Sequence, residues 1–232
     1  MMKFRLHRFQ PEQGGKQYVQ EVDLDIGPVG EMLLDALLEL KARDETLGFR
    51  RSCREGVCGS DAVNVNGRNV LACITPLVDL KQPIEIRPLP GLPVIRDFIV
   101  DMEPFYLQYK SIKPWLVNHD PVPERERLQT PDERSELDGA VECILCGACT
   151  SSCPSFWWHP DRFVGPAGLL QAWRFIADSR DMATEERLDY LEDAYRLYRC
   201  RGIMNCVETC PKGLNPAEAI GKIRTMLVRR KG

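Results

Sequence analysis

The sequence has no long apolar run and little excess of charge of either sign. No stretch of about 18 consecutive apolar residues occurs, so no segment is expected to span a bilayer as a helix. The N-terminus, MMKFRLHRFQ, lacks the apolar core of a secretory signal peptide and the Arg- and Ser-rich composition of a transit peptide. The 31 basic and 34 acidic side chains give a net charge of −3, whereas nucleic-acid binding usually needs a strongly basic face. An exported, membrane-spanning or nucleic-acid-binding protein is therefore not expected.

What the chain has is ten cysteines among 232 residues. Without an export signal they favour metal ligation over disulfides, because the cytosol keeps thiols reduced. The first group is Cys53, Cys58 and Cys73, and the second is Cys143, Cys146, Cys149, Cys153, Cys200, Cys206 and Cys210. The intervening stretch is rich in proline and charge. We therefore predict two domains, residues 1–100 and 101–232, with a junction near residues 98–105.

The first half has the periodicity of strands with one helix. Apolar and polar residues alternate partly over 3–9 and 17–25, and 31–41 has apolar residues on one helical face. Asn66-Gly67 predicts a hairpin turn between residues 62–65 and 70–72, and 84–87 predicts a closing strand. We expect a small sheet crossed by a helix, with a cysteine loop after the helix.

The second half has helical periodicity over three segments, residues 166–177, 184–198 and 216–230. The last begins with Pro216, which suits a first helical turn because its missing N–H costs nothing there. The whole chain is predicted to be α+β, with the sheet in its first half.

The first cysteine group follows the plant-type ferredoxin spacing C-x4-C-x2-C…C for a [2Fe–2S] cluster, with aspartate at the third position. The candidate ligands are Cys53, Cys58, Asp61 and Cys73. Gly56 and Gly59 allow the loop to curl and to aim N–H groups at the cluster sulfurs. A carboxylate can bind iron as a harder ligand than thiolate. Two alternatives stay open: a structural zinc site, and an Asp61 that only caps the following turn.

The second group contains the bacterial ferredoxin run C-x2-C-x2-C-x3-C-P from Cys143 to Pro154, and a second run from Cys200 to Pro211 has Ile203 in place of one cysteine. The fourth cysteine of such a run binds the other cluster. A [4Fe–4S] cluster is therefore assigned to Cys143, Cys146, Cys149 and Cys210. A [3Fe–4S] cluster, which lacks the iron that a fourth thiolate would hold, is assigned to Cys153, Cys200 and Cys206. Zinc knuckles are the alternative, although zinc sites favour paired C-x2-C units.

At these residues the chain resembles the iron–sulfur subunit of succinate dehydrogenase, respiratory complex II. The resemblance covers nearly the whole length, in the blocks FRRSCREGVCGSDA, LACITP, IRPLPGLPVIRD, ECILCGAC, SCPSFWW, YRCRGIMNC and CPKGLNP. It implies an N-terminal plant-type [2Fe–2S] ferredoxin (β-grasp) domain followed by an all-α bacterial-ferredoxin-like domain.

The resemblance also implies a role in the tricarboxylic acid cycle and aerobic respiration. Electrons would pass from the FAD of a flavoprotein subunit through [2Fe–2S], [4Fe–4S] and [3Fe–4S] to ubiquinone. The implied partners are that flavoprotein and two membrane-anchor subunits of cytochrome b type, at the cytoplasmic face of a bacterial inner membrane. The chain has no Gly-x-Gly-x-x-Gly motif, which is consistent with flavin binding by the partner.

In the family, residues at the positions of Pro154, Trp157, Trp158 and Ile203 line the quinone pocket, and the second Trp donates a hydrogen bond. An indole offers an apolar body and one N–H donor, and a quinone needs an apolar slot with few donors. The alternative is that the Trp pair contacts the anchor helices at membrane-interface depth.

Arg201 stands where the family commonly has histidine. Arginine stays charged near neutral pH and cannot shuttle a proton there. We expect it to raise the [3Fe–4S] potential and to stabilise quinone anions, with a salt bridge to a partner subunit or a lipid phosphate as the alternative.

Three other functions share parts of this pattern. The iron–sulfur subunit of a quinol:fumarate reductase shares the cluster layout, but the SFWW block and Ile203 resemble the succinate dehydrogenase side. A free multi-cluster ferredoxin-like carrier would have little use for an exposed Trp pair beside its last cluster. A zinc-bound structural module would contain no iron.

Overall fold

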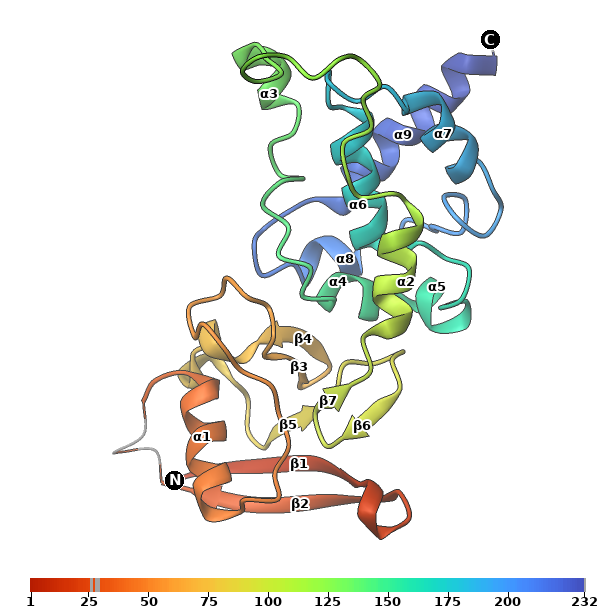
Figure 1. The fold of residues 1–232 in the computed structure, drawn as a ribbon. Helices are drawn as coiled ribbons and strands as arrows, with labels where there is room; N and C mark the ends of the chain where they lie inside the picture. The colour runs from red at the N-terminus through yellow and green to blue at the C-terminus, as the bar shows by residue number, and fades with distance from the viewer. Residues whose placement is uncertain (26, 28–29, 232) are drawn as a thin grey trace. The chain divides into compact units, whose positions relative to one another are not determined.

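The computed structural model describes residues 1–25, 27 and 30–231. Figure 1 labels its helices and strands. The chain divides into two compact units, one made of Met1–Met102 with Ile144–Ser152 and the other of Glu103–Cys143 with Cys153–Gly232. The sequence suggested a single boundary near residue 100, whereas the structure also assigns a later cysteine-bearing segment to the first unit.

The first unit is built on a five-stranded sheet with the strand order β2-β1-β5-β3-β4. Its strands are β1 (Met2–Gln10), β2 (Lys16–Leu24), β3 (Ala62–Val65), β4 (Arg68–Leu71) and β5 (Ile84–Arg87). Neighbouring strands are antiparallel except β1 and β5, which are parallel. Asn66 and Gly67 both have positive φ, 51° and 86°, as the hairpin turn of Asn-Gly requires. The predicted hairpin is confirmed.

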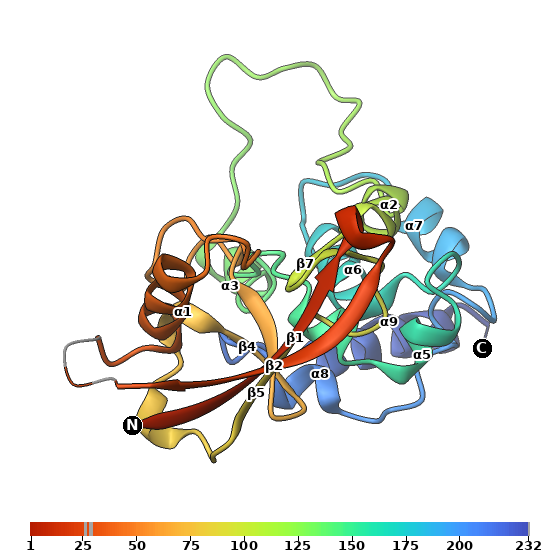
Figure 2. The ribbon, with the colours of Figure 1, turned by 90° about the horizontal axis from the view of Figure 1, so that it is seen from below.

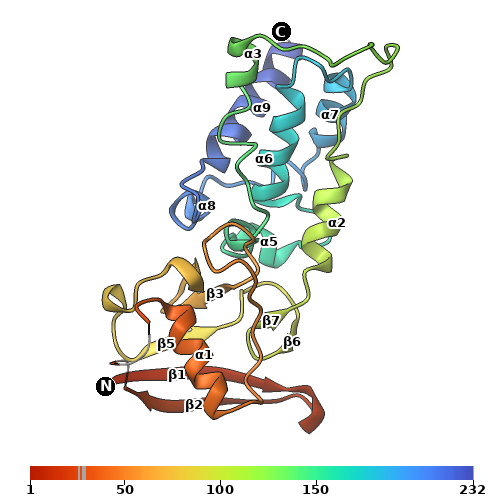
Figure 3. The ribbon, with the colours of Figure 1, turned by 60° about the vertical axis from the view of Figure 1, so that its left-hand side comes forward.

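Helix α1 (Leu33–Arg43) lies across one face of this sheet (Figure 3). It buries the apolar face that its sequence predicts, from Leu33 to Leu40. The N–H of Leu33 donates to the carbonyl of Thr75 at 2.9 Å, which fixes the start of the helix beside the segment that carries Cys73. Short elements complete the unit: η1 (Pro11–Gln13), η2 (Ala72–Ile74), η3 (Leu77–Asp79), β6 (Val94–Arg96), β7 (Ile99–Val100) and α4 (Ala148–Ser151).

A buried ion pair locks β1 to the turn between β6 and β7. Arg8 and Asp97 are both fully buried, and Nε of Arg8 donates to Oδ1 of Asp97 at 2.9 Å. Arg8 also pairs with Asp44 at 2.9 Å, and Oδ2 of Asp97 accepts the N–H of Gly48 at 2.7 Å. Because residues 44–48 lead into the first cysteine loop, this network anchors the start of that loop.

The second unit is helical, as predicted. Its helices are α2 (Glu103–Ser111), α3 (Pro131–Ser135), α5 (Pro154–Trp158), α6 (Gly165–Ile176), α7 (Thr184–Leu191), α8 (Asn205–Glu208) and α9 (Pro216–Lys231). Helix α6 is buried along most of its length and packs against α2, α7 and α9. Figure 2 views the same ribbon from below, with α6 among these helices. Within the described residues, no helix combines the length and the apolar character needed to cross a membrane.

One predicted helix is shorter than its periodicity suggested. The prediction covered residues 184–198, but α7 ends at Leu191. The carboxylate of Asp193 accepts the N–H groups of Tyr195 and Arg196 at 2.8 and 3.2 Å, which replaces helical bonds with a side-chain-stabilised turn. The predicted helices at 166–177 and 216–230 are confirmed by α6 and α9.

Candidate iron–sulfur sites

The first cysteine loop, between α1 and β3, directs backbone N–H groups at sulfur atoms. Sγ of Cys53 accepts from the N–H groups of Glu55, Val57 and Cys58, at 3.5, 3.4 and 3.2 Å. Sγ of Cys58 accepts from the N–H of Cys53 at 3.4 Å. Such donors reduce the negative charge on thiolate sulfur and so suit an anionic iron–sulfur cluster.

Residues in the left-handed backbone conformation curl the first cysteine loop. Arg54, Gly56 and Gly59 have φ of 67°, 72° and 68°, a region that glycine enters at no steric cost. The turn at Gly56 sends its N–H to Sγ of Cys73 at 3.3 Å, across 17 positions of sequence. The loop thus has the form that its glycines predicted.

Asp61 lies just before β3 and is 4% exposed. Its Oδ2 accepts the backbone N–H of Cys73 at 2.6 Å, so the aspartate touches the last predicted ligand of this site. Its Oδ1 is buried and has no hydrogen-bond partner among the residues that the structure describes. One oxygen therefore has a structural role, and the other fits a metal ligand.

The thiols of this loop differ in acidity. Burial raises the pKa of Cys73 to about 12, and the neighbouring Asp61 acts in the same direction. Burial also opposes ionisation of Cys58, but hydrogen bonds from Ser60 and Cys53 outweigh it and lower its pKa to about 7. The Ser60 hydroxyl lies 3.2 Å from Sγ of Cys58. The sequence prediction did not include Ser60, although its place between two predicted ligands was a usable signal.

Two of the four residues predicted to bind the [4Fe–4S] cluster, Cys146 and Cys149, belong to the first unit. Cys149 is in α4, and Gly147 before it is left-handed with φ of 78°. The other two, Cys143 and Cys210, belong to the second unit. There both pack against one apolar cluster of Ala140, Leu170, Leu214 and Ala219.

The three residues predicted to bind the [3Fe–4S] cluster interact within the second unit. Burial raises the pKa of Cys206 to about 11, and the nearby Cys153 and Cys200 thiols raise it further. The pKa of Cys153 is raised by burial and also by Cys200. The effect of Cys200 on both Cys153 and Cys206 indicates that the three side chains lie near one another. Across the described part of the chain, no group of three or more His, Cys, Asp or Glu is arranged to hold a single metal ion.

The residues predicted for quinone contact flank these cysteines. Pro154 opens α5 directly after Cys153, and Trp157 and Trp158 near the end of that helix are 43% and 75% exposed. Ile203 is 47% exposed, and Arg201 next to Cys200 is exposed as well. The second unit thus presents large apolar side chains beside the predicted last cluster.

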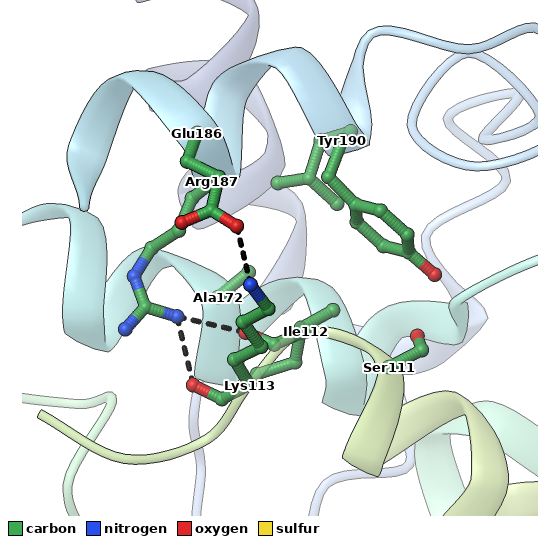
Figure 4. A pocket seen from close by; sticks show the side chains of 8 residues that line it. Ser111, Ile112, Lys113, Ala172, Glu186, Arg187 and Tyr190 are labelled. Atoms are coloured by element: carbon green, nitrogen blue, oxygen red, sulfur yellow. Dashed lines mark hydrogen bonds and ion pairs between the residues drawn. The ribbon is translucent and has the colours of Figure 1, made fainter. Parts of the chain in front are cut away.

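A separate cavity of about 190 Å³ in the second unit is lined by Ser111, Ile112, Lys113, Ala172, Glu186, Arg187, Tyr190 and Leu191. Figure 4 shows Lys113 paired with Glu186, and Arg187 donating to the carbonyls of Ile112 and Lys113, both at 2.8 Å. None of these residues is a predicted cluster or quinone residue.

Known families and proteins match most of this chain. Residues 3–107 match the 2Fe-2S iron-sulfur cluster binding domain, and residues 139–214 match the 4Fe-4S dicluster domain. The succinate dehydrogenase iron-sulfur subunit of Coxiella burnetii is 57% identical over 229 residues, which are 98% of this chain and 97% of that protein. Its counterpart from Paracoccus denitrificans is 49% identical over 229 residues, 98% of this chain and 88% of that protein.

Solved structures share the fold. A chain of the Mycobacterium smegmatis Sdh1 complex in its apo form superposes with a TM-score of 0.84 at 24% identity, covering 99% of this chain and 96% of that one. The matched domains confirm the predicted fold class and favour iron–sulfur clusters over zinc. With relatives 57% and 49% identical over nearly its full length, the chain belongs to the family of succinate dehydrogenase iron–sulfur subunits.

Proposed function

We propose that this chain is the electron-transfer subunit of a succinate:quinone oxidoreductase. The observation that carries the proposal is the 57% identity, over 98% of the chain, to a protein named as the iron–sulfur subunit of succinate dehydrogenase. The N–H donors around Cys53 support it, as does the buried Oδ1 of Asp61, which has no hydrogen-bond partner among the described residues, because both fit a cluster at the predicted position.

Three sets of residues would hold the clusters. The [2Fe–2S] set is Cys53, Cys58, Asp61 and Cys73, the [4Fe–4S] set is Cys143, Cys146, Cys149 and Cys210, and the [3Fe–4S] set is Cys153, Cys200 and Cys206. When bound, such clusters supply one-electron transfer at potentials that the protein tunes. The chain's own part is to direct N–H groups at sulfur, to keep the thiols of Cys73 and Cys206 buried, and to leave Ile203 where a fourth thiolate would stand.

The end of the path would be ubiquinone beside α5. The exposed Trp158 supplies one N–H donor and an apolar face, and Trp157, Pro154 and Ile203 supply apolar surface. Arg201 adds a permanent positive charge that favours reduced, anionic quinone. The partners would be an FAD-bearing flavoprotein and two membrane-anchor subunits, at the cytoplasmic face of a bacterial inner membrane.

Low-temperature EPR of the purified complex tests the proposal. The oxidised protein should show a [3Fe–4S] signal and the dithionite-reduced protein a [2Fe–2S] signal, with about nine iron atoms per chain. A tagged chain should also recover a flavoprotein and two small membrane proteins. Recovery of the chain alone with its clusters would indicate a free carrier, and absence of iron would overturn the proposal.

A further inference from the structure

The first unit contains a segment that the sequence prediction assigned to the second domain. Residues 144–152 carry Cys146 and Cys149, and they fold with the sheet and the first cysteine loop. Helix α4 in this segment packs against β4 (Figure 1). Two sets of contacts hold it there, and neither involves a predicted cluster ligand of the first loop.

The first contact is a close backbone approach at Gly59. A Cβ built on Gly59 would lie 2.6 Å from Cβ of Cys146 and 2.9 Å from its Cα. Side chains with a Cβ do not tolerate such distances, and the φ of 68° at Gly59 also favours glycine. Only glycine therefore allows the residue after Cys58 to contact Cys146. Cys58 is a predicted [2Fe–2S] ligand and Cys146 a predicted [4Fe–4S] ligand, so Gly59 alone connects the two.

The second set is a buried amide network. Asn69 in β4 is 3% exposed, and its Nδ2 donates to the carbonyl of Ala148 at 2.9 Å and to Oγ of Ser151 at 3.0 Å. Its Oδ1 accepts from Nδ2 of Asn64 in β3 at 2.8 Å. Because a buried amide without partners is costly, these bonds hold α4 at one place on the sheet.

We infer that Gly59 and Asn69 are positioning residues that fix the spacing between the [2Fe–2S] and [4Fe–4S] clusters. The inference rests on the proposed function and extends it to the step between these two centres. That step is a one-electron exchange in which one centre is oxidised and the other reduced, and no bond forms or breaks. Its rate falls as the separation of the two centres grows, because electron transfer needs overlap between the orbitals of donor and acceptor. The part of the spacing that depends on Cys146 and Cys149 is set inside the first unit.

Matched variants of the intact complex test this inference. Gly59→Ala is compared with Gly67→Ala: both positions have positive φ, 68° and 86°, but nothing lies within 4 Å of a Cβ on Gly67. Asn69→Asp is compared with Asn66→Asp, which loses a donor to the carbonyl of Lys81 rather than to residues 144–152. The readout is relaxation enhancement of the [2Fe–2S] EPR signal when the [4Fe–4S] cluster is reduced, because this magnetic coupling falls steeply with distance.

Gly59→Ala and Asn69→Asp should weaken the coupling and slow electron transfer between the two clusters, while both control variants keep wild-type values. Selective loss of the [4Fe–4S] signal in either variant also supports the inference, because both act on the segment that carries Cys146 and Cys149. Unchanged coupling with both clusters present, or loss of [2Fe–2S] alone, overturns it. If the wild-type complex shows neither cluster signal, the proposed function itself fails, which is a distinct outcome.

Discussion

The carboxylate of Asp61 accepts the backbone N–H of Cys73 at 2.6 Å through Oδ2 and leaves its buried Oδ1 without a hydrogen-bond partner in the described part of the chain. Asp61→Ala should remove most of the [2Fe–2S] signal and cost about 1–3 kcal/mol, because the Cys73 N–H loses its acceptor. Asp61→Cys should retain the cluster at a lower potential, since thiolate is the softer, more electron-donating ligand.

EPR redox titration checks both Asp61 variants. Asp79→Ala, at an exposed position in η3, is the control and should leave the signal unchanged. An Asp61→Ala protein with a full and unaltered [2Fe–2S] spectrum would show that Asp61 is only a turn cap.

Ile203→Cys should convert much of the [3Fe–4S] cluster to [4Fe–4S], because it restores the missing position of the second ferredoxin run. The oxidised EPR signal should then fall, the potential should drop, and quinone reduction should slow. Ile203→Val keeps an apolar side chain and should retain the oxidised signal. If that signal persists in full in Ile203→Cys, the ligand assignment at this position is wrong.

The potential of the [3Fe–4S] cluster should not vary with a histidine-like titration between pH 6 and 8, because Arg201 stays charged over that range. Arg201→His should introduce such a dependence, and Arg201→Gln should lower the potential without one. Redox titrations of the three proteins at several pH values provide the measurement. A wild-type potential that already titrates near pH 6.5 would contradict the role given to Arg201.

Arg8→Met should lower the free energy of unfolding by about 3–5 kcal/mol, because Asp97 would be left as an uncompensated buried charge. Arg5→Met on the same strand is the control. Arg5 is partly exposed and meets the exposed Glu21 at 3.4 Å, so its loss should cost less than about 1 kcal/mol. Chemical denaturation followed by circular dichroism gives both values, and equal values would refute the structural role of the buried pair.

Acid should lower the stability of the first unit, because Glu85 becomes protonated. Hydrogen bonds from Arg87 and His7, at 2.8 and 2.6 Å, lower the pKa of Glu85 from 4.5 to about 2. A lowered folded-state pKa contributes stability above pH 4.5 that is lost as the pH falls toward 2. Glu85→Gln should therefore be less stable than wild type at neutral pH, with a difference that shrinks across that interval. A difference independent of pH would assign the effect to packing.

Local patterns predicted most of the fold. Alternation of apolar and polar residues predicted β1 and β2, and the Asn66-Gly67 pair predicted the hairpin. Helical periodicity predicted α1, α6 and α9. Cysteine spacing predicted iron–sulfur clusters, which the matched 2Fe-2S and 4Fe-4S domains support, while the individual ligand sets stay predictions. These features can be predicted from the sequence because each depends on residues only a few positions apart.

Contacts between residues far apart in the sequence could not be predicted from local patterns. The bond from Asn69 to Ala148 spans 79 positions, and no local pattern assigns residues 144–152 to the first unit. The early end of α7 depends on the side chain of Asp193, which competes with the helix for backbone donors. The unpaired oxygen of Asp61 is likewise visible only once the orientation of its carboxylate is known.

The placement of α4 also determines how the protein can be divided into fragments. A fragment cut after Met102, where the cysteine-free stretch suggests a natural break, would lack Ala148 and Ser151 and so strip both acceptors from the amide of Asn69. In that fragment the side chain of Asn69, which is 3% exposed in the intact chain, would lose two of its hydrogen bonds. A permuted fragment that joins residues 144–152 to the N-terminal sheet would keep both of these hydrogen bonds.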